Sequence, residues 1–219
     1  MNNKQSGFTL VEIAIVLVII GLLLGGVLKG QELINSAKVK NYATDFRNIP
    51  LLIYGYQDKF RALPGDDPTA DTRFTGGTKA TNGTLGNGVI QGNWNSETML
   101  DETVLFWQHV RLANLAAGST DFASLANASL PANADGGRIG IQSGTAPLTG
   151  LAGSYFICSA GIQGKYAKQL DVTMDDGDTA KGSMRAGTGT APGTAITAAP
   201  LSGTGAIVDG NTYTVCLGF

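Results

Sequence analysis

The chain has 219 residues, a formal net charge of −2 and 31 glycines, and 15% of its residues are charged. This length allows one domain of ordinary size with appendages. The weakly acidic balance offers no basic patch, so we expect no nucleic-acid partner. Glycine at about twice its average usage predicts many turns and loops rather than a helical bundle.

The first predicted element is an apolar run over residues 8–28, in which Glu12 is the only charged residue. As a helix rising about 1.5 Å per residue, this run reaches about 31 Å, which matches the hydrocarbon core of a bilayer. A buried core helix seldom lacks a polar face over such a length. A secretory signal has a shorter apolar region followed by a small-residue cleavage site, which is missing here. We therefore expect a membrane segment that is retained.

The positive charges around the run do not fix its orientation. Lys4 precedes it, whereas Lys29, Lys38, Lys40 and Arg47 follow it. Counting these charges favours a cytoplasmic C-terminal side. A disulfide in the C-terminal part would favour the opposite side, because it needs an oxidising compartment.

The stretch KQSGFTLVEI carries a short polar leader that ends in Gly7, then Phe8, and then Glu12 inside the apolar run. This pattern resembles the N-terminus of type IV pilins and of type II secretion pseudopilins. The resemblance implies that prepilin peptidase cleaves between Gly7 and Phe8 and that the new N-terminal Phe8 is methylated. It also implies that the leader stays in the cytoplasm and that the C-terminal body faces the periplasm.

Glu12 has two interpretations. A charged side chain at the centre of a membrane costs roughly 2.5–3.5 kcal/mol on insertion scales, and such residues tend to be functional. Glu12 can reach the headgroups from its place near the start of the run. Alternatively, it pairs in a filament with the amine of a neighbouring Phe8, as the resemblance implies for assembly, where an unpaired buried charge is strongly disfavoured.

The helix is expected to continue past the membrane to residue 60, because apolar residues recur at gaps of three and four. Pro50 predicts a kink or break near Ile49. Four glycines within and after the apolar run weaken the helix or permit close helix packing: Gly21, Gly25, Gly26 and Gly30. The expected organisation is a cleaved leader (1–7), a transmembrane and assembly segment (8–28), a periplasmic helical segment (29–60) and a globular head (61–219).

The first part of the head should contain a type II turn and a second helix. Pro64 and Gly65 suit the central positions of the turn. The helix is predicted after Asn95 or Ser96, with Gly118 as its stop. His109, the only histidine, has no accompanying nucleophile motif, so we expect a packed or hydrogen-bonded residue rather than a catalytic base.

The C-terminal part suits a small sheet. GSYFICSA and NTYTVCLGF predict strands, residues 164–174 predict a short helix, and the stretch over 186–210 predicts a long loop or strands with loose turns. Cys158 and Cys216 lie in the two strand-like segments and fit one disulfide or two free thiols. Pilins often carry one C-terminal disulfide, so the resemblance favours the bridge.

Asp175, Asp176 and Asp178 flank a glycine turn and supply oxygen atoms of the kind that bind calcium. Their spacing matches no EF-hand, and acidic turns that bind only water are far commoner. We therefore assign no metal to this loop.

The sequence thus predicts an α+β, pilin-like fold, with a long N-terminal helix packed on a head built on an antiparallel sheet. We expect no catalytic residue and no cofactor. The implied partners are prepilin peptidase, other pilin or pseudopilin subunits, an inner-membrane assembly platform and the lipid bilayer. The expected location is the inner membrane and then a periplasmic or extracellular filament. A minor tip subunit, an adhesin or a binding module is the alternative to a main structural subunit.

Overall fold

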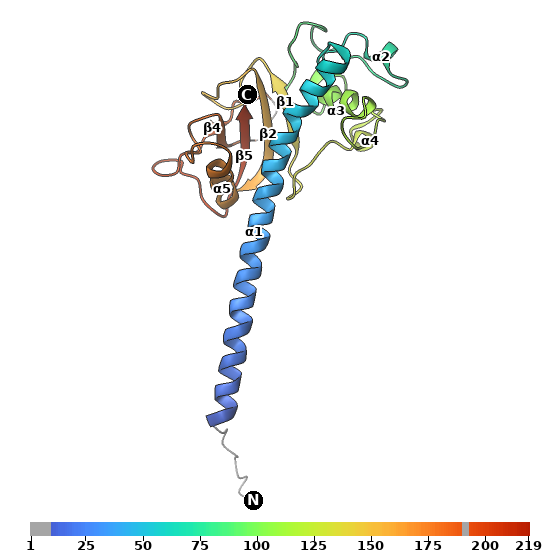
Figure 1. Ribbon diagram of the computed structural model, residues 1–219. Coiled ribbons are helices and arrows are strands. Elements are labelled where there is room, and N and C mark those ends of the chain that lie inside the picture. The colour runs from blue at the N-terminus through green and yellow to red at the C-terminus, as the bar shows by residue number, and fades with distance from the viewer. Residues whose placement is uncertain (1–9, 190–192) are drawn as a thin grey trace, which may run out of the picture. The chain divides into compact units, whose positions relative to one another are not determined.

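The computed structural model describes residues 10–189 and 193–219 (Figure 1). The chain divides into two compact units, Met1–Lys38 and Val39–Phe219. One helix, α1 (Leu10–Phe60), runs through both units, and the other described helices and strands belong to the second. The second unit combines helices with one five-stranded antiparallel sheet, which confirms the predicted α+β class.

Within the second unit, α1 buries one stripe of side chains at spacings of three and four residues. The stripe consists of Val39, Tyr42, Ala43, Phe46, Ile49, Ile53 and Tyr56. The first six of these residues join the main hydrophobic core together with side chains of the sheet and of the helices packed on it. The apolar periodicity of the sequence therefore marks the face of α1 that the head covers.

Of the kink or break predicted near Ile49, the break is wrong, because the helix continues through Pro50. A proline inside a helix costs about 3 kcal/mol, because it lacks an N–H donor and its ring contacts the preceding turn. Phe46, Ile49 and Ile53 lie on both sides of Pro50 and are 1%, 4% and 0% exposed. Burying each such side chain contributes about 1.5–3 kcal/mol. Packing of the two flanking turns therefore outweighs the cost of the proline.

The sheet has the strand order β1-β2-β5-β3-β4, and all neighbouring strands are antiparallel. The strands are β1 (Ile139–Ser143), β2 (Tyr155–Gln163), β3 (Met184–Thr188), β4 (Thr197–Ala198) and β5 (Thr212–Gly218). The strands predicted from GSYFICSA and NTYTVCLGF are β2 and β5, which are neighbours. The stretch over 186–210 supplies the end of β3 and all of β4, whereas β1 was not predicted.

The two faces of the sheet have different roles, because alternate side chains of a strand point to opposite faces. Ile157 of β2 and Val215 of β5 belong to the core that also contains the α1 stripe. Cys158 and Cys216 belong to a second hydrophobic cluster, which includes Trp94. The sheet thus separates the helical core from the cluster that contains both cysteines.

Besides α1, the described residues contain four helices: α2 (Ala70–Arg73), α3 (Glu102–Leu112), α4 (Leu125–Ala128) and α5 (Gly164–Met174). The predicted helix over 164–174 is α5. The predicted start of α3 at Asn95 or Ser96 is wrong, because its N-cap is Asp101, and its predicted stop at Gly118 is also too late. The Ser96 hydroxyl group accepts the N–H of Thr98 (3.0 Å) and donates to Asp101 (2.5 Å). These bonds hold residues 96–101 in a turn, so the helix begins only after Asp101.

Candidate functional site

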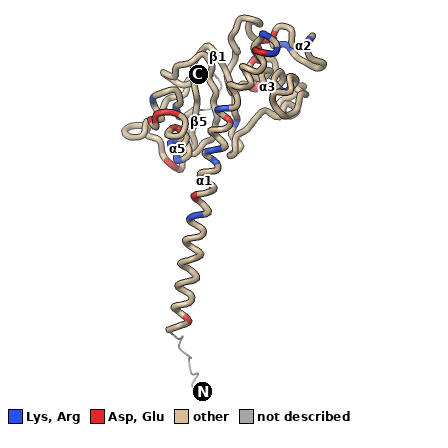
Figure 2. The backbone as a smooth tube through the Cα atoms, viewed as in Figure 1, with Lys and Arg blue, Asp and Glu red and all other residues tan. Residues whose placement is uncertain are grey.

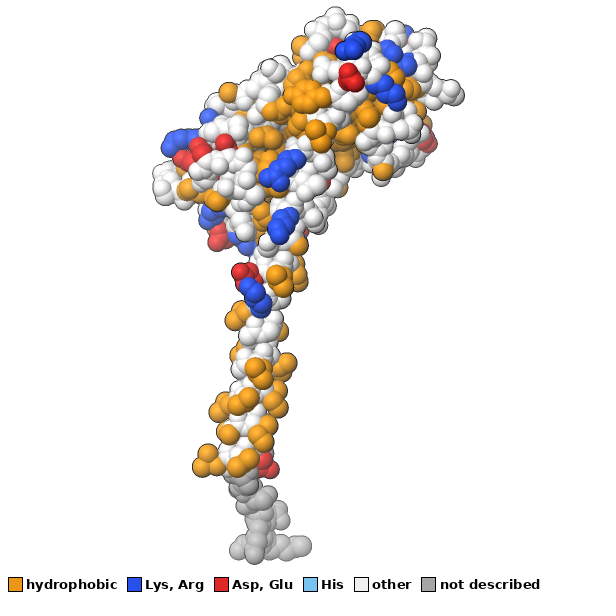
Figure 3. Space-filling model, in the orientation of Figure 1, with side chains coloured by type: hydrophobic (Ala, Val, Ile, Leu, Met, Phe, Trp, Pro, Cys, Tyr) orange, Lys and Arg blue, Asp and Glu red, His pale blue; other side chains and the backbone are white. Residues whose placement is uncertain are grey.

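The first part of α1 is apolar on every side and is not covered by other residues of its unit. All described side chains from Leu10 to Leu28 are exposed, with Leu10 at 88%. A Cβ atom added at Gly21 or Gly25 would meet no other atom within 4 Å, and the same holds at Gly26. By length and composition this helix can cross a membrane, with a mean hydropathy of 2.8 in its most apolar window. Figure 3 shows hydrophobic side chains around this segment.

Glu12 lies in the first turn of α1. The next charged residues along the helix are Lys29 and Glu32, as the colours in Figure 2 show. The side chains of these two residues form an ion pair of 2.7 Å. The expected cleavage site between Gly7 and Phe8, and the methylation of Phe8, lie outside the described residues.

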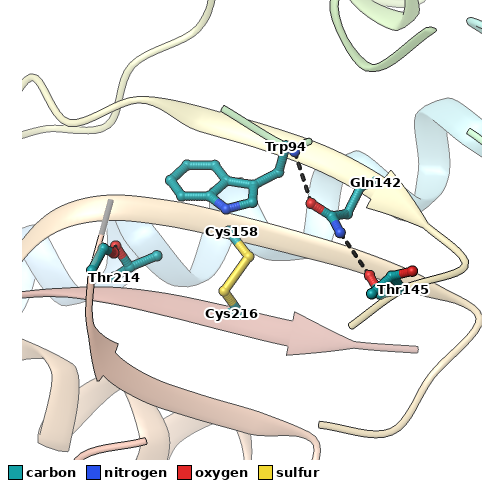
Figure 4. Close-up of a disulfide and its surroundings, with 7 residues drawn as sticks. Trp94, Gln142, Thr145, Cys158, Thr214 and Cys216 are labelled. Atoms are coloured by element: carbon teal, nitrogen blue, oxygen red, sulfur yellow. Dashed lines mark hydrogen bonds between the residues drawn. A yellow bond between two sulfur atoms is a disulfide. The ribbon is translucent and has the colours of Figure 1, made fainter. Parts of the chain in front are cut away.

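A disulfide joins Cys158 of β2 to Cys216 of β5, as the resemblance implied. The two residues stand directly opposite each other in the register, and both are fully buried. The indole of Trp94 lies beside the bridge (Figure 4). Gln142 of β1 holds the Trp94 backbone in place, because its Oε1 accepts the backbone N–H of Trp94 (2.8 Å) while its Nε2 donates to the Thr145 carbonyl (2.6 Å). In the chain-entropy model, closing a loop of this length contributes about 4 kcal/mol.

His109 is a buried residue of α3 with both ring nitrogens engaged. Its Nδ1 accepts the backbone N–H of Gly65 over 2.9 Å, and its Nε2 lies 2.8 Å from the Thr78 carbonyl oxygen. These partners assign the proton of the neutral ring to Nε2. Burial lowers the pKa of His109, which keeps the ring neutral. The expected packed, hydrogen-bonded histidine is confirmed.

Gly65 must approach α3 closely for this contact. A Cβ atom at this position would collide with the backbone carbonyl of Glu102, and Gly65 has a φ of 91°. Both facts favour glycine, because other residues rarely adopt a positive φ. The positive φ also suits the second central position of the predicted type II turn.

Two neighbouring acids of the head, Asp67 and Asp66, organise the loops around them. Asp67 is fully buried and accepts hydrogen bonds from Tyr56 Oη (2.8 Å), the Thr69 N–H (2.9 Å) and Arg73 Nε (3.0 Å). Burial by itself would raise the pKa of Asp67, but these hydrogen bonds bring the pKa below its usual value. The signal in the sequence is the Asp-Pro-Thr order, which suits a turn closed by the aspartate side chain.

Asp66 has a similar function for a second loop. Its carboxylate accepts the backbone N–H groups of Gly86 (2.5 Å), Asn87 (3.3 Å) and Gly88 (2.8 Å). Hydrogen bonds to a charged group are worth about 1.5–3 kcal/mol, more than those between neutral groups. Asp66 and Asp67 together fasten two loops of the head around the end of α1.

Each acid of the loop after α5 already has partners within the chain. Asp175 accepts the Met184 N–H (2.8 Å), Asp176 accepts the Asp178 N–H (2.8 Å), and Asp178 pairs with Lys181 (2.7 Å). No group of three or more potential metal ligands occurs among residues 10–189 and 193–219. The hydrogen bonds account for the acidic residues of this turn.

Comparison with protein families matches residues 2–28 to the prokaryotic N-terminal methylation motif. No match was found among curated proteins or among solved structures. The motif is the signature of type IV pilins and pseudopilins, and it ends where the exposed apolar part of α1 ends. The chain therefore carries the N-terminal signature of a type IV pilin-like precursor, joined to a pilin-like α+β layout of one long helix and an antiparallel sheet.

Proposed function

We propose that this chain is a structural subunit of a type IV pilus or of a type II secretion pseudopilus. It is stored in the inner membrane, loses residues 1–7 to prepilin peptidase and polymerises through α1. The observation that carries the proposal is the methylation motif at residues 2–28, whose apolar part, residues 10–28, forms the exposed first part of helix α1. A subunit of this kind has no catalytic role.

The exposed apolar part of α1 needs a non-aqueous environment. Removing one large aliphatic side chain from water contributes about 1.5–3 kcal/mol, and such residues are exposed throughout the segment from Leu10 to Leu28. Lipid supplies this environment before assembly. In a filament, the same side chains pack against identical helices of other subunits, so one surface serves both states.

Glu12 gives the packing of these helices a defined register. Cleavage after Gly7 creates an ammonium group on Phe8, and a neighbouring subunit can bring its Glu12 carboxylate to this group. In an apolar environment the two charges attract strongly, whereas either charge alone is heavily penalised. Only those arrangements of helices that pair the charges are then favourable.

The head suits the periplasmic side of the membrane. The bridge between Cys158 and Cys216 persists in an oxidising compartment and would be reduced in the cytosol. The bridge thus supports a single span with the head in the periplasm, although the positive charges after the apolar run favour the reverse. The disulfide agrees with the orientation that the resemblance to pilins implies, in which the leader stays in the cytoplasm.

Immunogold electron microscopy tests the proposal in cells that overproduce the protein, with an antibody against the head. We expect filaments labelled along their length, and none in cells that lack prepilin peptidase. Filaments on the cell surface would identify a pilus subunit. Label confined to filament ends would instead favour the minor tip subunit or binding module. Protein that is processed but never found in a filament would contradict a structural role.

A further inference from the structure

Glu102, the first residue of α3, is a carboxyl group that the head buries completely. Its Oε2 accepts the backbone N–H of Gln91 over 2.7 Å. Its Oε1 has no hydrogen-bond partner among the described residues. An ionised carboxylate is costly to bury when one oxygen is unpaired, because water would otherwise solvate that oxygen. The protonation of Glu102 therefore matters for the surrounding structure.

The charged groups that act on Glu102 are both acids. Asp66 approaches from the loop that follows α1, and Asp101 is the N-cap residue of α3 itself. Burial makes the largest contribution to the pKa of Glu102 and raises it. The two acids raise this pKa further, while the hydrogen bond from Gln91 lowers it. The net result raises the pKa of Glu102 to about 7.

Residues 82–92 form the segment that Glu102 holds. Asp66 binds its middle through Gly86 and Gly88, and Glu102 binds its end through Gln91. The Gln91 side chain closes the segment on itself, because its Oε1 accepts the N–H of Thr84 (2.6 Å). Gly83 also lies against the acid, since a Cβ atom there would come within 2.8 Å of Glu102 Oε1.

We propose that Glu102 is a proton-dependent latch on residues 82–92, which are held against α3 while this carboxyl group is protonated and are released when it ionises. Ionisation places an unpaired charge next to Asp66 and Asp101, and opening the segment lets water reach that charge. Gly86 and Gly88 also line a cleft of about 660 Å³ at the end of α1. Release of the segment therefore changes one wall of this cleft.

The direction of the pH effect follows from the raised pKa. In the open state Glu102 has an ordinary pKa of about 4.3. Opening therefore releases a proton between that value and about 7. The closed state is fully favoured below about pH 4.3, loses stability as the pH rises, and reaches its minimum above 7. Over this interval the opening equilibrium increases up to about tenfold per pH unit.

Hydrogen exchange measured by mass spectrometry tests the latch on the full-length chain in detergent micelles from pH 4.5 to 8.5. Rates are divided by the intrinsic exchange rate at each pH. We expect the protection of residues 82–92 to fall up to about tenfold per pH unit and to level off above pH 7. Peptides from β2 should stay protected throughout. Constant protection of residues 82–92 across this range would overturn the proposal.

Two variants assign the effect to one side chain. Glu102→Gln keeps the shape and an acceptor oxygen but cannot ionise, so its protection should not depend on pH. Glu97→Gln removes an exposed acid ahead of the same helix and should keep the wild-type dependence. An unchanged pH dependence in Glu102→Gln would overturn the proposal.

Should that variant not fold, a carbon-13 titration of wild-type glutamate carboxyl groups replaces it. An inflection near pH 7 supports the latch, and no inflection above about pH 5 refutes it.

Discussion

The backbone N–H of Gly65 donates to Nδ1 of His109 over 2.9 Å, which joins the loop after α1 to the last turn of α3. On the other side of the ring, Nε2 lies 2.8 Å from the carbonyl oxygen of Thr78. The imidazole ring thus connects two loops and a helix, and it does so only in its neutral form. Protonation of Nδ1 would turn the acceptor for Gly65 into a donor.

This relationship predicts that acid weakens the head through His109. The folded-state pKa of His109 is lowered, so its contribution is fully present above its ordinary pKa of about 6.5 and is lost as the pH falls below that value. His109→Leu should lower the free energy of unfolding at pH 7.5 by about 1–3 kcal/mol, because it leaves Gly65 N–H and the Thr78 carbonyl unpaired. Between pH 7.5 and 5.0 it should then lose less stability than wild type does. Denaturant unfolding followed by tryptophan fluorescence measures both values.

The comparison between variant and wild type is essential, because other buried groups respond in the opposite direction. Burial raises the pKa of Glu102 to about 7 and that of Asp171 to about 6, so these acids favour the folded state as the pH falls. They contribute equally to both proteins and cancel in the difference. Equal losses in wild type and His109→Leu would contradict the role given to His109.

Asp67 should be the acid whose removal damages the head most. Asp67→Ala leaves Tyr56 and Arg73 without their shared acceptor, and we expect it to lower the free energy of unfolding by about 2–4 kcal/mol. Asp58→Ala is the matched control, because Asp58 is an exposed acid 4.0 Å from Arg61. It should have no measurable effect. Similar midpoints for the two variants in a denaturant titration would refute this function of Asp67.

The disulfide should be complete in protein recovered from the periplasmic side of the membrane. Thiol labelling under denaturing, non-reducing conditions should find neither Cys158 nor Cys216 free, since the bond between their sulfur atoms survives unfolding. The same sample labelled after reduction should show two thiols. Two labelled thiols without reduction would rule out the bridge and remove the main argument for orientation.

Processing is predicted to occur between Gly7 and Phe8. The intact mass of membrane-extracted wild type should correspond to a chain that begins at Phe8 and carries one added methyl group. Gly7→Leu should keep the leader, whereas Gly30→Leu, the same change outside the motif, should be processed normally. Loss of residues 1–7 from Gly7→Leu would show that the site is misplaced.

Regular patterns in the sequence predicted the long helix α1 and two strands of the sheet, β2 and β5. The apolar periodicity after residue 38 defined the buried stripe of α1 and its end at Phe60, because a helix that covers a core repeats every three or four residues. The apolar stretches around Cys158 and Cys216 predicted β2 and β5. Pro50 was misjudged, because local propensity does not include the packing of the turns on both sides.

The buried polar residues of the head could not be predicted in this way. From the sequence, Glu102 is an ordinary acid in the first turn of a helix. There it would be expected at the surface, where its negative charge interacts favourably with the helix dipole. Its burial depends on residues 82–92, an irregular segment that precedes α3 in the chain and folds over it. Arg111 is likewise buried, and it donates to the carbonyls of Ser119, Ala128 and Ser129. Such contacts arise from loop paths, which have no periodic signal.

The most direct test of the proposed assembly is Glu12→Val, with Glu32→Val as a matched control that removes a carboxylate of the same helix beyond the apolar run. The measurement compares two pools from the same cells: processed protein in the membrane and protein sheared off in filaments. We predict that Glu12→Val enters the membrane pool normally but yields few or no filaments. Its neighbour's amine would be buried unpaired, at a cost of roughly 3–5 kcal/mol. Glu32→Val should assemble as wild type does. Normal filaments from Glu12→Val would contradict the account and would mean that this acid only reaches the headgroups.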